Sequence, residues 1–204
     1  MVSLFPQLPA DFQIALASLR EVLSRSELTL AEVPAPARLA PFGVAVGAEV
    51  IVDGEQLATG RFILLHDPQG KALWDGTFRI VSYIRAQLEA DIGNDSLLGN
   101  VAWAWLTEAL EEQDAQYSSA GGTATRILSE SYGTLAARPD SVDIELRASW
   151  TPTGTAITPH LQAWANIVCT FAGLPPVPEG VTLLPRRSSE RTRHQPRQRP
   201  LKNI

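Results

Sequence analysis

The clearest pattern in the chain is an unbroken alternation of apolar and polar residues from Val142 to Thr151. Successive side chains of a strand point to opposite faces, so this segment has one apolar and one polar face. Such a strand is typical of an antiparallel sheet covered on one side, because strands of parallel sheets are buried on both faces. The pattern therefore predicts an antiparallel sheet with its helices on one face.

Two earlier segments form a predicted hairpin. Residues 43–52 alternate in the same way, and Asp53-Gly54 is a strong signal for a tight turn to a return strand at 57–66. The run Asp67-Pro68-Gln69-Gly70 predicts a second turn, because proline presets the backbone and glycine accepts positive φ.

The next segment has two interpretations. Residues 77–89 read as a third strand of a meander, with one apolar face. The spacing of Val81, Ile84, Leu88 and Ile92 also fits a helix, and both interpretations stay open. Further along, Gly121-Gly122 precedes a strand expected at about 123–132. This glycine pair lacks the lysine of a phosphate-binding loop and predicts a turn or bulge.

Three segments have helical spacing. The first, 9–25, carries one apolar stripe and is followed by an extended connector rich in proline. The second, 96–113, follows the capping residues Asn94, Asp95 and Ser96 and has a wide apolar face. The third begins at Thr158-Pro159 and ends at Gly173. The stripe residues of the first helix are Phe12, Leu16, Leu19 and Leu23, and the connector prolines are Pro34, Pro36 and Pro41.

These elements predict an α+β fold in the order α-βββ-α-ββ-α. We expect a mostly antiparallel sheet of about five strands with helices on one face. One domain is expected over residues 1–184, and a disordered basic tail over 185–204. The tail carries seven basic residues and one glutamate, whereas the body has a formal charge of −11, which together give the net −5 of the chain.

Composition excludes several classes of protein. Hydrophobic residues make up 45% of the chain, enough for a core, and a single cysteine cannot form an internal disulfide. No segment resembles a signal peptide or reaches the roughly 18 apolar residues of a membrane span. We therefore expect a cytoplasmic protein that does not enter the membrane.

Six blocks of the sequence carry a resemblance to a known family. They are Leu64–Pro68, Trp74–Arg79, Trp103–Leu106, Ile144–Pro152, His160–Trp164 and Ala172–Pro176. Together they resemble an uncharacterised actinobacterial family, known as domain of unknown function 3000. The resemblance covers roughly residues 8–184 and implies a cytosolic protein, but no activity and no catalytic residues. The order of elements is also similar to that of type III secretion chaperones, an analogy of architecture alone.

Candidate chemistry is sparse. His66 beside Asp67 could form half of a proton relay, and Asp75 is near in sequence, but no serine or cysteine nucleophile sits in a recognisable elbow. One histidine with two carboxylates is a thin metal site, and a structural role is the alternative. Trp74 lies in a polar turn, either exposed as a binding anchor or folded back over the hairpin. The binding candidates are Trp74, His66, Asp67, Asp75 and Arg79.

Two other reactive residue types have structural interpretations. His160 falls in the first turn of the last helix, and Cys169 lies between apolar positions of the same helix, where a cysteine is usually buried. We expect no catalytic residue, no metal and no cofactor.

Three functions remain. The first is a non-catalytic binding or adaptor protein, with a protein partner or a second copy at the sheet edge, the sheet face or the Trp103 stripe. The second is a nucleic-acid-associated factor acting through the tail by phosphate neutralisation. The third is an enzyme centred on His66, Asp67 and Asp75. The tail arginines are Arg186, Arg187, Arg191, Arg193, Arg197 and Arg199.

Overall fold

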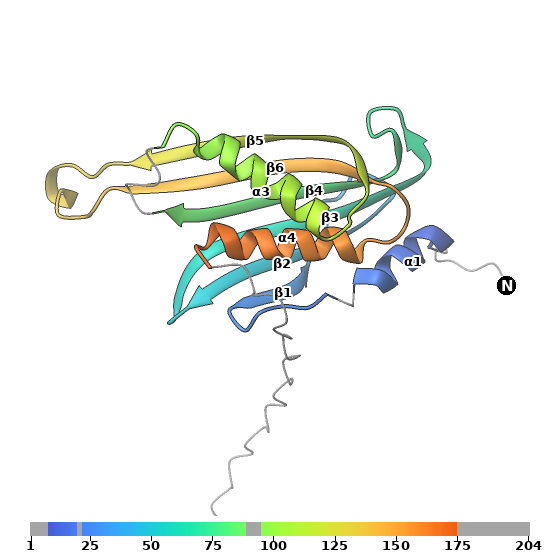
Figure 1. Cartoon of the computed structure of the whole chain (residues 1–204), viewed down its shortest axis with the longest axis horizontal. Coiled ribbons are helices and arrows are strands. Elements are labelled where there is room, and N and C mark those ends of the chain that lie inside the picture. The colour runs from blue at the N-terminus through green and yellow to red at the C-terminus, as the bar shows by residue number, and fades with distance from the viewer. Residues whose placement is uncertain (1–7, 20–21, 89–94, 175–204) are drawn as a thin grey trace, which may run out of the picture.

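The computed structural model describes residues 8–19, 22–88 and 95–174. Its centre is a six-stranded antiparallel sheet in the order β1-β2-β3-β4-β6-β5. Figure 1 shows the long strands side by side with helices crossing them. The strands are β1 (Leu28–Val33), β2 (Phe42–Val52), β3 (Glu55–Lys71), β4 (Gly76–Leu88), β5 (Tyr117–Ser129) and β6 (Ser141–Pro152). The helices are α1 (Ala10–Ser18), α3 (Leu98–Glu112) and α4 (Thr158–Phe171), with a short 3-10 turn at Gly133–Leu135.

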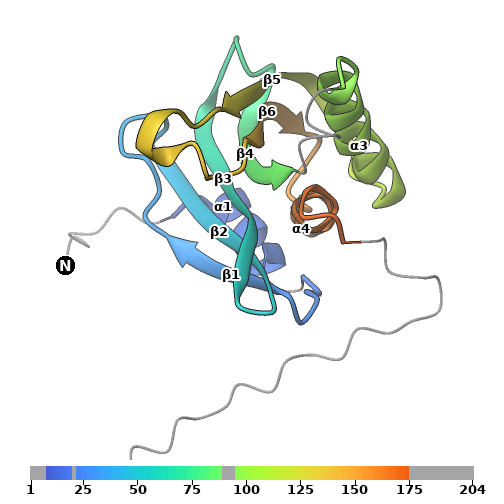
Figure 2. The same ribbon diagram turned by 90° about the vertical axis from the view of Figure 1, so that its left-hand side faces the viewer.

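The three helices all cover the same face of the sheet, and the sheet curves around α4 (Figure 2). The main core lies between this face and the helices. Phe62 of β3 packs against Trp150 of β6 and Trp164 of α4, with ring centroids 6.4 and 5.6 Å away. All three side chains are buried. The α+β class and the antiparallel sheet with helices on one face are confirmed.

The alternating segment forms β6, as predicted. Val142, Ile144, Leu146, Ala148 and Trp150 are buried beneath the helices. The opposite face of the strand is less exposed to solvent than its sequence suggests, because Glu145 and Thr151 are also buried there. Both make hydrogen bonds to neighbouring strands or turns, which explains how polar groups are accommodated at these positions.

The sheet has one strand more than predicted. β1 was missed because it has only six residues and its helix-facing positions, Leu28, Leu30 and Glu32, end in a charged residue. It pairs antiparallel with β2, placing Glu32 opposite Val46. Tertiary pairing with an existing strand therefore stabilises a segment whose own pattern is weak.

The predicted turn at Asp67–Gly70 is wrong. β3 continues to Lys71, and the pairing with β4 shifts register between His66 and Lys71, so the Pro-Gln-Gly run forms a bulge. Gly70 has φ +71°, a backbone conformation that glycine adopts more readily than other residues because it has no Cβ. The chain reverses only after Lys71, whose carbonyl accepts hydrogen bonds from the N–H groups of Trp74 and Asp75.

Of the two interpretations of residues 77–89, the strand is correct, since β4 spans Gly76–Leu88. A single strand between β3 and β6 satisfies the backbone of both neighbours. Ile92, which made the helical spacing look longer, lies outside the described residues. β5 begins at Tyr117, before the glycines, and its register shift between Ser118 and Gly121 confirms the predicted bulge.

The helices differ from their predictions at the ends. α1 stops at Ser18 and not near residue 25, and the backbone of Leu23 instead hydrogen-bonds the side chain of Gln162. Asp95 accepts a hydrogen bond from the N–H of Leu97 before α3. Thr158 is the first residue of α4, as predicted, and its hydroxyl donates to the carbonyl of Ser18 at 2.6 Å. These bonds hold α1 against α4.

Candidate functional site

His66, Asp67 and Asp75 do not come together. His66 points to the helix side and is buried between aromatic rings, with Phe12 at 5.6 Å and Phe78 at 4.2 Å between centroids. Asp67 is the next residue on the strand, so its side chain points the other way, where it accepts a hydrogen bond from the N–H of Gln69 at 3.1 Å. Asp75 occupies the turn, with φ +54°. These three side chains therefore form no proton relay.

Trp74 is folded back over the hairpin. It is 8% exposed and packs with Ala45, Ile63 and Leu65 on the face of the sheet opposite the helices. The ammonium of Lys71 lies 4.5 Å from the centre of its ring. Of the two sequence interpretations, the structural one fits, because a buried indole offers little surface to a partner.

Arg79 is the fifth predicted binding residue, and it joins three strands on that same outer face. Its guanidinium donates to the hydroxyls of Ser149 (2.7 Å) and Thr151 (3.0 Å) on β6 and to the carbonyl of Ser119 (2.8 Å) at the β5 bulge. Burial lowers the pKa of the Arg79 guanidinium. These bonds give Arg79 a structural task, the attachment of β4 and β6 to the irregular start of β5.

The rest of the outer face carries pairs of opposite charge. Arg85 meets Asp143 across β4 and β6 at 2.8 Å, and this carboxylate raises the pKa of Arg85 through its hydrogen bond and its charge. Glu145 accepts from both Tyr83 (2.9 Å) and Arg147 (2.8 Å). Burial, with the Glu145 hydrogen bond, raises the pKa of Tyr83. The Arg85–Asp143 pair has an exposed guanidinium and contributes little to stability. Glu145 is buried, and its hydrogen bonds to Tyr83 and Arg147 compensate for the burial of its carboxylate.

His160 and Cys169 are both buried on α4, as expected from the sequence. The indole of Trp150 donates to Nδ1 of His160 at 3.1 Å, and burial lowers the pKa of His160 to about 4. Burial also raises the pKa of the Cys169 thiol to about 11. A neutral imidazole with a fixed partner and a protonated thiol are features of a core. Across the described parts of the chain, no three histidine, cysteine or carboxylate side chains gather as metal ligands.

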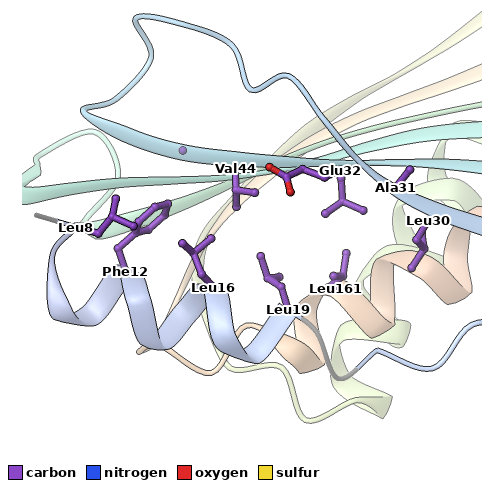
Figure 3. A pocket seen from close by; sticks show the side chains of 11 residues that line it. Leu8, Phe12, Leu16, Leu19, Leu30, Ala31, Glu32, Val44 and Leu161 are labelled. Atoms are coloured by element: carbon purple, nitrogen blue, oxygen red, sulfur yellow. The ribbon is translucent and has the colours of Figure 1, made fainter. Parts of the chain in front are cut away.

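A groove lies between α1 and the strands β1 and β2, and we call it the α1 groove. Its volume is about 530 Å³, within the range of small-ligand sites. Figure 3 shows Leu8, Phe12, Leu16 and Leu19 pointing from the helix side toward the strands. The strand side and the far end supply Leu30, Ala31, Glu32, Gly43, Val44, Val46 and Leu161.

The α1 groove arises from the spacing of its residues. Leu8, Phe12, Leu16 and Leu19 follow steps of four, four and three, so they occupy one side of α1 and its flanks. Val44 and Val46 alternate on β2 and are opposed by the inward positions of β1. Phe12 is buried, whereas Leu16, Leu19, Leu30, Val44 and Val46 are only half-buried. The groove therefore exposes apolar surface that the fold itself leaves partly uncovered.

Glu32 is the charged residue of the α1 groove. It faces the helix side of β1 beside Val46, and Figure 3 shows its carboxylate next to Val44. Among the residues that the structure describes, no cation forms an ion pair with it. An apolar groove with one carboxylate favours an apolar occupant that brings a positive charge.

Sequence reasoning did not find this groove. The stripe of the first helix was recognised, but the groove depends on where that helix lies over strands that begin 10 or more residues after its end. One signal was present. A glutamate at the third inward position of Leu28, Leu30 and Glu32 is a charge on a face that should be apolar.

A comparison with known families matches residues 8–182 to a family described as "Protein of unknown function (DUF3000)". The chain belongs to the DUF3000 family. This confirms the resemblance to domain of unknown function 3000 noted from the sequence blocks, and the description of the family names no activity. No curated protein and no solved structure matched it.

Two further observations concern membrane-spanning helices and the basic tail. No helix in the described part of this DUF3000 protein is long and apolar enough to cross a membrane. The six tail arginines lie outside the described residues, so nucleic-acid binding through them stays a prediction.

Proposed function

We propose that this DUF3000 protein is a non-catalytic binding protein that receives an extended, apolar, positively charged segment of a partner protein in the α1 groove. The observation that carries the proposal is the groove itself, apolar apart from Glu32 and about 530 Å³ in volume. The fold analogy with secretion chaperones, which are binding proteins, agrees with it but carries no weight alone.

An extended peptide fits this site better than a compact ligand. β1 is the edge strand of the sheet in the described part of the chain, where it pairs with β2. A segment added along β1 gains backbone hydrogen bonds and directs every second side chain toward the helix side, where the groove lies. Apolar residues at alternate positions would contact Leu16, Leu19 and Val46.

The charge of Glu32 selects among such segments. A lysine or arginine beside the apolar positions gains an ion pair, whereas an aspartate or glutamate is repelled at short range. The site is for the same reason a poor receptor for fatty acids, whose carboxylate would meet that of Glu32.

The test uses two synthetic decapeptides with leucine at alternate positions, one carrying two lysines and the other two glutamates. Fluorescence anisotropy with the full chain should show about tenfold tighter binding of the lysine peptide. Glu32→Lys should reverse this preference. Glu108→Lys, an equal change in net charge at an exposed position of α3, should leave it unchanged. Equal effects of the two variants would disprove the proposal.

A further inference from the structure

We propose that the segment Val177–Arg187 of the same chain occupies the α1 groove and competes there with the partner. This inference rests on the proposed function for its consequence, because occupation in cis sets how readily a partner segment binds. Three observations support the placement: the position where the described chain ends, the length of the segment that follows, and its charge.

The described chain ends about one helix length from the groove. Leu174 follows α4 and packs against the main core, and Leu161, at the start of the same helix, lines the groove. Twelve residues separate them, which corresponds to roughly 20 Å along the helix. About six extended residues cover that distance. Residues 175–184 are therefore long enough to return along α4 and β1 to the groove.

The composition of this segment suits the site. Val181 and Leu183 occupy alternate positions, followed by Leu184, and the pair Arg186-Arg187 comes directly after them. With Val181 and Leu183 against the apolar lining, the arginines arrive beside Glu32, the groove residue that lacks an ion pair in the described structure. Its one acidic residue, Glu179, lies seven residues before Arg186, and the segment keeps a net charge of +1 from two arginines and one glutamate. The segment thus has the two properties required of an occupant.

The extent of the family match points the same way. It runs eight residues past Leu174, to Thr182, so the first part of the segment belongs to the same family unit as the folded body. The competing occupant within the chain is the N-terminal segment 1–7, which contains Leu4 and Phe5 and directly precedes Leu8 of the groove. It contains no charged side chain to pair with Glu32.

Disulfide trapping in the full chain tests this placement. Leu30 faces the helix side of β1 and is half-buried in the groove lining, so Leu30→Cys places a thiol in the groove, and it is combined with Leu183→Cys. The native Cys169 is buried and does not compete. After oxidation, we expect a bond between positions 30 and 183 within monomeric chains, found by mass spectrometry of a digest.

The matched control moves one cysteine to the other edge of the sheet. Thr125→Cys is exposed on β5 and, paired with Leu183→Cys, should form at least about tenfold less intramolecular disulfide. Similar yields from both pairs would overturn the inference. So would a bond from Leu30→Cys to Leu4→Cys in place of Leu183→Cys, or a bond formed only between two chains.

A charge swap supplies an independent criterion. Glu32→Arg should lower the yield of the Leu30–Leu183 trap several-fold, and Arg186→Glu with Arg187→Glu should restore it. A yield that stays the same in both variants would contradict an ion pair between Glu32 and these arginines.

The outcomes for the two proposals are separable. In the full chain, Val181→Asp with Leu183→Asp should strengthen binding of the lysine peptide about tenfold by removing the competitor. If the trap forms but this variant binds no peptide, the proposed function fails and the inference stands. If peptide binds with the expected charge preference and no trap forms, the inference fails alone.

Discussion

Trp150 donates its indole N–H to Nδ1 of His160 across 3.1 Å, and both side chains are essentially inaccessible to water. The bond requires a neutral imidazole with its proton on Nε2, because a protonated Nδ1 would turn a second donor toward the indole. It joins β6 to the first turn of α4 and therefore holds the helix layer on the sheet.

The first prediction concerns pH. The pKa of His160 is about 4 in the folded protein and ordinarily 6.5, so between these values the unfolded chain binds a proton that the folded chain does not. The contribution of His160 to the free energy of unfolding is fully present well above pH 6.5. It falls by about 3 kcal/mol as the pH drops to 4. Urea denaturation from pH 7.5 to 4 measures it. His160→Gln should remove this part of the pH dependence, and an unchanged slope would contradict the assignment.

The second prediction compares two adjacent glycines of β5. A Cβ at Gly122 would lie 2.7 Å from the carbonyl oxygen of Arg147 and 2.8 Å from the ring of Trp103, whereas at Gly121 it meets nothing within 4 Å. Gly122→Ala should lower the free energy of unfolding by about 1–3 kcal/mol. Gly121→Ala should leave it unchanged or raise it by about 0.5 kcal/mol. Equal effects, measured by thermal and urea unfolding, would refute the close approach of α3 to β5.

The third prediction concerns the contact between β3 and α4. A Cβ at Gly60 would come 2.6 Å from Cζ2 of Trp164 and 3.0 Å from a methyl group of Val168. We expect Gly60→Ala to cost about 2 kcal/mol of stability through this overlap. In a double-mutant cycle with Trp164→Phe, which shortens the ring, the two losses should sum to more than the loss of the double variant. Strict additivity would show that the overlap is relieved elsewhere.

The fourth prediction concerns thiol chemistry. Burial raises the pKa of Cys169 to about 11, so at pH 8 about one thiol in a thousand is ionised, and its sulfur is shielded by the core. The native protein should be inert to a disulfide reagent such as DTNB over an hour. In guanidinium chloride, one thiol per chain should react within minutes. Rapid reaction of the native protein would mean that α4 opens readily.

The candidate residues show why a site is harder to predict than a fold. His66 and Asp67 are neighbours in sequence, but a strand sends them to opposite faces, so adjacency excluded their cooperation. Trp74 looked exposed because its sequence neighbours are polar, yet a satellite cluster with Ile63 and Leu65 buries it. The α1 groove needs α1, β1 and β2 together, and no local pattern reports such contacts.

The sequence by itself determined the class of fold, the strand character and buried face of β6, the helical stripes and the family, because side-chain period and block composition are local properties. Only the tertiary structure decided that Leu28–Val33 is a strand, that β3 runs through a bulge to Lys71, and that α1 ends at Ser18. Each of these depends on backbone partners distant in the chain. The same holds for Glu32, whose neighbours in the groove are brought to it by pairing with β2 and by the packing of α1 against α4.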